Sequence, residues 1–288
     1  MKKSLFIFIT LLLSTQSFAR SGQKAIYGSR LDNEFTNKDS TDMIKILSTG
    51  IGYIVPKKRI RKYDRQTSMI EARPLRELSN LCSHERFAQN LASAPSCTGF
   101  LVAEDLLVTA GHCIEDKKDC KDMNIVFGVT VAKETSQGFR IANDNIYTCK
   151  KVITSSNSNG RDYSLIKLNK KVKARKIYRI GDDSKLTDKS SVYMIGHPLG
   201  LAVTYTKPAR VTHLYLDDIF KAPLNSFSGN SGSPVLNAAT DEVVGILTAG
   251  QTDYIKKDKE CTRYARYNSG GETITRISLL KEQIEANK

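Results

Sequence analysis

The chain has 288 residues, of which 40% are hydrophobic and 26% are charged. It is long enough to bury a full hydrophobic core, and its composition excludes an intrinsically disordered protein. Its formal net charge is +14, but the basic residues are scattered apart from the run KKRIRK at residues 57–62. Because runs of charge are usually solvated and no nucleic-acid motif is present, we expect a solvated basic surface and no nucleic-acid partner.

The N-terminus has the pattern of a secretory signal peptide. In MKKSLFIFITLLLSTQSFA, a basic pair precedes an apolar stretch over residues 5–13, and small residues end the segment. The stretch is well short of the roughly 20 residues that a transmembrane helix needs. We therefore expect residues 1–19 to be removed, leaving Arg20 as the first residue of a secreted or periplasmic protein without stable membrane insertion.

Residues 20–80 are polar and weakly patterned, with AIYG and GIGYIV as their apolar islands. We expect an N-terminal extension or a propeptide there. From residue 81 onward, short runs rich in Val, Ile, Leu and Tyr alternate with Gly, Asn, Asp and Ser, as in TGFLVA, LLVTA, SLIKL and EVVGILTAG. Runs of this length and spacing predict antiparallel strands in a sandwich or barrel over residues 81–288.

The end of the chain breaks the strand pattern. In RISLLKEQIEANK, Ile277, Leu280 and Ile284 recur at helical spacing. The sequence therefore predicts a short C-terminal helix with one apolar face.

The cysteines predict disulfides. They are even in number and lack the paired C-x-x-C spacing of a zinc or redox site. Six cysteines allow 15 pairings, and residue spacing alone does not choose among them. The six are Cys82, Cys97, Cys113, Cys120, Cys149 and Cys261.

Three segments carry candidate chemistry. SFSGNSGSPVLN contains Ser231 between two glycines, which allow a strained backbone whose amides can turn toward a ligand. A serine nucleophile needs a base and a group that orients the base. His112 ends the apolar run LLVTAGHC, and Asp162 precedes a strand in GRDYSLIKL. Taken singly, each has a plainer interpretation: a turn for the serine loop, a structural histidine and a solvated turn aspartate.

Together, CTGFLVAEDLLVTAGHC, GRDYSLIKL and GNSGSPV, in the order His, Asp, Ser, resemble the trypsin-like serine peptidases. The resemblance is closer to their bacterial secreted branch, which includes the glutamyl endopeptidases, and it covers roughly residues 81–288. It implies an all-β fold of two six-stranded antiparallel β-barrels with the active site between them. It also implies that Ser231 is the nucleophile, that His112 is its base and that Asp162 orients the histidine. The amides of Gly229 and Ser231 would form the oxyanion hole.

The resemblance also bears on the disulfides. The family commonly links the cysteines that match Cys97 and Cys113, which flank the strand and turn that deliver the histidine. Cys120 and Cys149 lie beside strands of the first barrel and could join them. Elimination then leaves Cys82 with Cys261.

Two departures from the family pattern concern activation and specificity. Asn230 stands where many relatives have an aspartate that pairs with a new N-terminal amine, so the usual activation switch is not expected. The residues matching the specificity pocket carry no charge, which predicts a preference for neutral substrate side chains. They are Asn225, Ser226, Leu247, Thr248 and Gly250.

These observations predict an exported serine endopeptidase that acts on protein or peptide substrates, with no cofactor and no metal. Two alternatives stay open. One is a catalytically silent binding or adhesion module on the same fold, and the other is an esterase, since ester hydrolysis uses the same groups.

Overall fold

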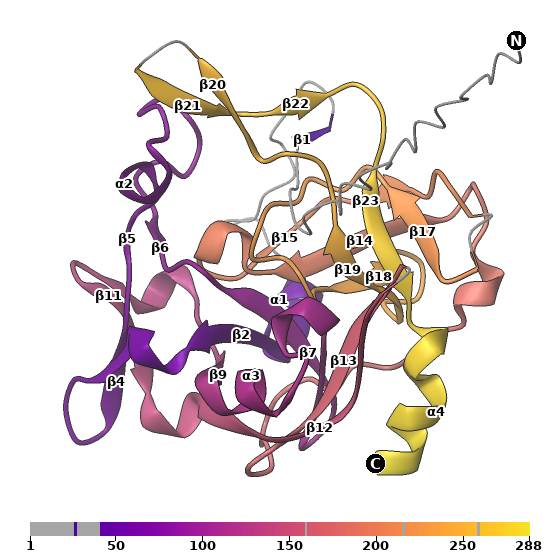
Figure 1. The fold of residues 1–288 in the computed structure, drawn as a ribbon, viewed down its shortest axis with the longest axis horizontal. Coiled ribbons are helices and arrows are strands. Elements are labelled where there is room, and N and C mark those ends of the chain that lie inside the picture. Colours follow the sequence, from indigo (N-terminus) through magenta and orange to yellow (C-terminus); the bar gives the residue numbers. More distant parts are fainter. Residues whose placement is uncertain (1–25, 28–40, 159, 215–216, 258–259) are drawn as a thin grey trace, which may run out of the picture.

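Two β-rich units lie side by side in the chain (Figure 1). The computed structural model describes residues 26–27, 41–158, 160–214, 217–257 and 260–288. The expected signal peptide lies outside these residues. No helix in the described ranges is long and apolar enough to cross a membrane.

The first unit is a closed six-stranded barrel in the order β12-β13-β8-β7-β2-β9. Its strands are β2 (Ile51–Pro56), β7 (Cys97–Ala103), β8 (Leu106–Thr109), β9 (Met123–Phe127), β12 (Ile146–Ser158) and β13 (Arg161–Leu168). All neighbouring pairs are antiparallel.

The barrel corrects the domain boundary expected at residue 81. β2 lies within residues 20–80, yet it pairs with β7 on one side and with β9 on the other, and without it the barrel would be open. The peptidase-like domain therefore begins at or before β2, and this part of the segment is neither an arm nor a propeptide.

The second unit is a seven-stranded sheet in the order β15-β14-β18-β19-β23-β17, with β16 paired to β14. Its strands are β14 (Ser191–Gly196), β15 (Thr204–Tyr205), β16 (Ala209–Arg210), β17 (Ile219–Ala222), β18 (Pro234–Asn237), β19 (Val243–Ala249) and β23 (Glu272–Arg276). The all-β fold class is confirmed, although this second unit is a seven-stranded sheet where a six-stranded barrel was expected.

Smaller elements decorate the two units. One sheet contains β3 (Ile60–Lys62), β4 (Thr67–Glu71), β10 (Glu134–Thr135) and β11 (Gly138–Ala142). The short pairs are β5 (Arg73–Pro74) with β6 (Leu91–Ala92), β20 (Tyr254–Lys257) with β21 (Cys261–Tyr264), and β1 (Ile26–Tyr27) with β22 (Arg266–Tyr267). The helices are α1 (Asp42–Ser48), α2 (Leu75–Ser79), α3 (Lys117–Asp122) and α4 (Ser278–Asn287).

Strand β7 shows how the core joins the two units. Successive side chains of a strand point to opposite faces. Phe100 and Val102 pack in a cluster shared with strands β14 and β19 of the second unit, whereas Leu101 packs inside the first barrel. The strand is therefore buried on both faces, which explains why it reads as a continuous apolar run.

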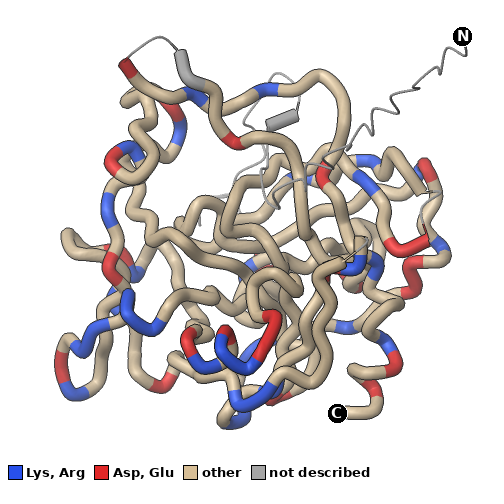
Figure 2. Tube along the Cα trace, in the orientation of Figure 1, with Lys and Arg blue, Asp and Glu red and all other residues tan. Residues whose placement is uncertain are grey.

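The predicted C-terminal helix is confirmed as α4. Leu280 and Ile284, one turn apart, are fully buried in the shared cluster together with Ile277. Figure 1 shows α4 beside β13 at the side of the molecule where the chain ends. In Figure 2, Lys and Arg occur around the whole described trace, as the scattered sequence pattern predicts.

Candidate active site

His112 lies in a tight turn that follows β8. The turn is one 3-10 helix, Gly111–Cys113, and it lies against β12 so closely that a Cβ at position 111 would collide with the carbonyl oxygen of Ser156. Only glycine allows this approach. A disulfide joins Cys113 to Cys97, the first residue of β7. The turn that presents His112 is thus fixed from two sides.

Asp162 reaches the same turn from β13. The register pairs Ser164 with Thr109 at the end of β8, so the residues before Ser164 extend past β8 and alongside the turn. The Asp162 Oδ2 atom lies 2.7 Å from His112 Nδ1, and Oδ1 accepts a hydrogen bond from the His112 amide at 3.1 Å. Because a carboxylate only accepts, Nδ1 carries the proton in the neutral ring and Nε2 keeps a lone pair.

Ser231 lies in the loop between β17 and β18 and is almost fully buried. Its carbonyl oxygen accepts a hydrogen bond from the Thr98 amide at 2.8 Å, and Cys113 Sγ lies 3.8 Å from the same oxygen. Cys113 is the neighbour of His112 in the chain. The serine loop and the histidine turn are therefore packed against each other at the start of β7.

The peptide planes of the serine loop have a defined orientation. The carbonyl of Ser228 accepts from the Leu199 amide at 2.5 Å, and that of Asn230 accepts from the Ser233 amide at 2.9 Å. In a trans peptide the N–H points opposite to the C=O. The amides of Gly229 and Ser231, the next residues in each case, consequently point the opposite way from the Leu199 and Ser233 amides that these carbonyls meet.

The structure gives a packing reason for glycine at position 229. Its φ is +93°, and a Cβ would lie 2.5 Å from the carbonyl oxygen of His197. The Gly229 carbonyl accepts from Thr98 Oγ1 at 2.8 Å, and Thr98 Oγ1 in turn accepts from the His197 amide at 3.0 Å. Close contact with the His197 carbonyl therefore already requires glycine here, apart from any approach of a ligand to the loop amides.

Asn230 is buried and satisfied by its own loop. Its Nδ2 atom lies 3.4 Å from Ser226 Oγ, and its Oδ1 atom accepts from Ser233 Oγ at 3.5 Å. Ser226 and Asn225 are both buried as well.

The remaining expected pocket residues belong to β19 and the position after it. Leu247 is fully buried in the core of the second unit, and its backbone bonds to Gly232 and Ser233. Thr248 donates its hydroxyl hydrogen to the Thr273 carbonyl at 3.2 Å. These bonds hold β19 directly beside the serine loop.

Sequence reasoning missed one charged residue beside this pocket. Glu272 is fully buried, and its carboxylate occupies the space where a Cβ on Gly250 would lie. Because β17 and β23 pair Ala222 with Glu272, the glutamate also lies near the segment that leads to Asn225. In the sequence, Glu272 follows two glycines and reads as a turn residue, so nothing local signals its burial.

The other histidines have different surroundings. His197 is almost fully buried; its ring contacts Tyr53 edge-on, and its Nδ1 lies 3.0 Å from the Leu201 carbonyl. Burial lowers the pKa of His197 from 6.5 to about 4. The side chain of His84 is 61% exposed, and His213 contacts the Thr212 hydroxyl.

The two further disulfides are Cys120–Cys149, between α3 and β12, and Cys82–Cys261. All three pairs match those expected. Cys97, His112 and Cys113 have potential ligand atoms within 4.8 Å of one another. Both sulfur atoms are in a disulfide, however, and only thiolates are strong metal ligands.

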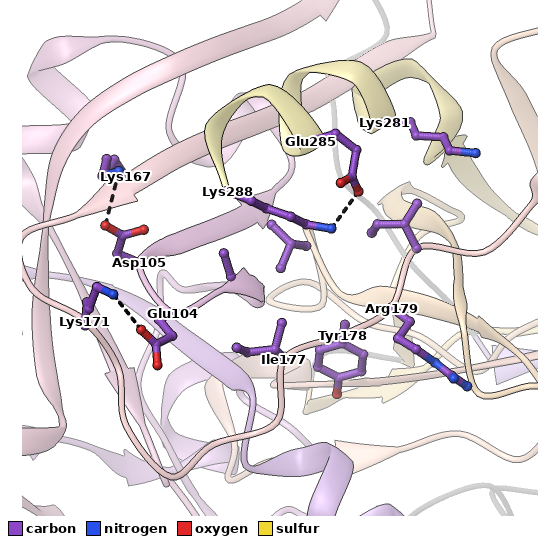
Figure 3. A pocket seen from close by; sticks show the side chains of 13 residues that line it. Glu104, Asp105, Lys167, Lys171, Ile177, Tyr178, Arg179, Lys281, Glu285 and Lys288 are labelled. Carbon is purple, nitrogen blue, oxygen red and sulfur yellow. Dashed lines mark hydrogen bonds and ion pairs between the residues drawn. The ribbon is translucent and has the colours of Figure 1, made fainter.

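A cavity of about 730 Å³ between α4 and the β7–β8 turn lies outside this arrangement. Its carboxylates are each paired with a lysine: Glu104 with Lys171, Asp105 with Lys167 and Glu285 with Lys288 (Figure 3). No serine, histidine or cysteine lines it.

Three solved structures share the fold with 13–15% sequence identity. A Glu endopeptidase in complex with MPD aligns over 91% of this chain and 98% of its own, with 15% identity and a TM-score of 0.55. The Vibrio cholerae VesB protease aligns over 90% and 68%, with 13% identity and a TM-score of 0.52. An inactivated protease paralogue of the scabies mite aligns over 85% and 96%, with 15% identity and a TM-score of 0.53.

A search of curated proteins finds no significant match. The model of the trypsin-like peptidase domain matches residues 97–246, slightly more than half of the chain, and this range contains His112, Asp162 and Ser231. The chain therefore belongs to the trypsin-like peptidase family, whose enzymes are serine endopeptidases.

Proposed function

We propose that this protein is an exported serine endopeptidase that cleaves peptide bonds through an acyl-enzyme on Ser231. The observation that carries the proposal is the 2.7 Å contact between His112 Nδ1 and Asp162 Oδ2, in a turn packed against the loop of Ser231. A carboxylate, an imidazole and a serine in this relation are the elements needed to activate a hydroxyl.

In the first step, the Ser231 hydroxyl attacks the substrate carbonyl carbon while His112 Nε2 takes its proton. Asp162 stabilises the imidazolium that forms and remains ionised. The new oxyanion is met by the amides of Gly229 and Ser231, a role favoured by the peptide orientation that the hydrogen bonds to the Ser228 and Asn230 carbonyls fix. One such donor typically lowers the activation free energy by about 2.7 to 4 kcal/mol.

The tetrahedral intermediate then collapses. The carbon–nitrogen bond breaks, and His112 gives its proton to the leaving amine. A water molecule next attacks the ester on Ser231 and passes its proton to His112. The bond between the substrate carbon and the serine oxygen then breaks, and His112 gives its proton to that oxygen, so the acid product leaves and the enzyme is unchanged after one cycle.

Activation is proposed to proceed without the ion pair that many relatives form with a new N-terminal amine. The Asn230 amide carries no charge and is already engaged by Ser226 and Ser233. Burying an ammonium beside it would leave that charge uncompensated.

Export is proposed from the signal-like residues 1–19. Three disulfides are consistent with an extracellular or periplasmic protein, because such bonds persist in oxidising compartments. N-terminal sequencing of the exported protein tests the cleavage site, with Arg20 as the expected first residue.

A fluorophosphonate probe, which phosphonylates activated serines with loss of fluoride, tests the catalytic proposal. We expect labelling of the wild-type protein and none of Ser231→Ala. Ser228→Ala is the matched control, since it removes a hydroxyl from the same loop that bonds to Asp253, and it should still be labelled. Folded wild-type protein that resists the probe would favour the silent binding module, and turnover of simple esters but not peptides would favour the esterase.

A further inference from the structure

Two cavities lie in series on one flank of the serine loop. The first has a volume of about 460 Å³ and is bordered by Gly229 and Leu199. The second has a volume of about 450 Å³, and the two share Leu78 and Ala94 in their walls. The two cavities are therefore neighbours, and together they form a path whose first part is bordered by Gly229 of the proposed oxyanion hole.

This path lies on the side of the leaving amine, if the proposed function holds. The acyl side of a substrate would pair along the end of β19, which is bonded to Gly232 and Ser233. The path instead runs over residues 94–96, which lead into β7, and β7 contacts the serine loop through the bond from Thr98 to Ser231. The portion of the substrate beyond the cleaved bond therefore extends toward these cavities.

The first cavity suits an apolar side chain. Its apolar wall contains Leu75, Leu78, Pro95, Leu199 and Tyr254, and Asp253, which bonds to the Ser228 hydroxyl, is the acid in its lining. Leu75 and Leu199 are part of a buried cluster, and Tyr254 stacks on Tyr264 at 5.7 Å between ring centroids. Packing holds Leu75, Leu199 and Tyr254 in place, so this part of the cavity is formed before a substrate binds.

The second cavity carries excess positive charge. Arg59, Arg61 and Arg73 line it, with Glu71 as the one acid in its wall. Arg61 is engaged, because its Nε lies 3.7 Å from Glu71 and its NH2 donates to Gln137 at 2.8 Å. Arg59 and Arg73 form no ion pair with any residue in the described ranges.

We propose that Arg59 and Arg73 form a subsite for a carboxylate of the substrate, located past the first residue on the leaving side. A guanidinium presents a planar fork of donors that fits a carboxylate in bidentate geometry. Two guanidinium groups facing one cavity repel each other, and a bound carboxylate removes that repulsion. The subsite thus selects substrates with an acidic group beyond the cleaved bond, a feature that the sequence-based pocket assignment does not include.

The carboxylate can come from an Asp or Glu side chain or from the C-terminus of the peptide. Internally quenched peptides with one fixed acyl side separate the two sources. One series places Glu or Gln at each of the second to fourth leaving-side positions, and the other ends in a free acid or an amide. We expect Glu, or the free acid, to raise kcat/KM tenfold or more at one position in low salt, and the advantage to shrink as ionic strength rises.

Variants assign the effect to these arginines. Arg59→Gln with Arg73→Gln should abolish the preference for the acid, whereas Arg65→Gln, on the β3–β4 turn, should retain it. Arg59→Glu with Arg73→Glu should reverse the preference in favour of Lys. The proposal is overturned if the wild-type enzyme cleaves Glu and Gln peptides at equal rates and also cleaves acid and amide peptides at equal rates. It is overturned as well if the preference for the acid survives in the double Gln variant.

A substrate without leaving-side residues separates this proposal from the proposed function. A small fluorogenic ester tests acyl-enzyme chemistry alone, and every arginine variant should hydrolyse it at the wild-type rate. If the wild-type enzyme does not hydrolyse it, the proposed function fails. If it does and no acid preference exists, only the subsite fails.

Discussion

At the scale of single residues, Asp162 has two separable contacts with His112. Its Oδ1 accepts from the histidine amide, and its Oδ2 lies beside Nδ1. Asp162→Asn can keep the first contact through its carbonyl oxygen while placing an NH2 donor toward Nδ1, which favours the wrong tautomer. We expect kcat/KM to fall roughly ten-thousand-fold with little change in thermal unfolding. A loss of less than tenfold in a folded variant would contradict the assigned role.

Glu272 supports a second prediction at this scale, which differs from the expected preference for neutral side chains. A buried carboxylate against Gly250 favours a substrate cation and disfavours acidic side chains. We expect the wild-type enzyme to prefer Lys and Arg before the cleaved bond. Glu272→Gln should lower kcat/KM for those substrates by about 10- to 150-fold, since a hydrogen bond to a charged group contributes about 1.5–3 kcal/mol.

The matched control for Glu272 is Glu242→Gln, which removes the same charge at the ion pair with Arg179. It should leave the substrate profile unchanged. A wild-type enzyme that prefers neutral side chains, or a Glu272→Gln profile identical to wild type, would restore the original expectation.

At the scale of elements, two disulfides that close short loops have different surroundings. Cys97–Cys113 spans 16 residues and fixes the histidine turn, whereas Cys120–Cys149 spans 29 residues and ties α3 to β12. Replacing either pair by alanine should lower the free energy of unfolding by about 3 kcal/mol. We expect kcat to fall much further for the first pair, because only that pair positions His112. Equal losses of kcat would show that the link acts through stability alone.

Elements also show what the sequence can and cannot predict. His112, Asp162 and Ser231 can be chosen as candidates from the sequence because each stands next to a strand with a strong local pattern. Strand β2 cannot be assigned to the barrel from the sequence, since GIGYIV is an isolated apolar segment whose partners, β7 and β9, lie far along the chain. Glu272 is missed for the same physical reason: its burial results from pairing with β17 and from contact with Gly250, neither of which leaves a local signal.

At the scale of the whole molecule, His197 lies where the two units meet. Its ring contacts Tyr53 of β2 at 4.7 Å between ring centroids. Its backbone carbonyl oxygen packs against Gly229, where a Cβ would lie only 2.5 Å from it. The Tyr53 hydroxyl lies 2.6 Å from the Ser93 carbonyl and 3.1 Å from that of Gly200. A charge on His197 would therefore disturb both the junction and the support of the serine loop.

Burial lowers the pKa of His197 from 6.5 to about 4, so between these values the unfolded chain binds a proton that the folded protein does not. The associated stability is fully present above pH 6.5 and is lost as the pH falls toward 4, by about 3 kcal/mol in total. His197→Asn, whose side-chain amide can still donate to Leu201, should unfold in urea with a weaker dependence on pH over this window. The same substitution at His213, outside the junction, is the control and should follow the wild-type curve. Parallel curves for wild type and His197→Asn from pH 7 to 4 would show that the folded protein takes up the proton at His197 without cost.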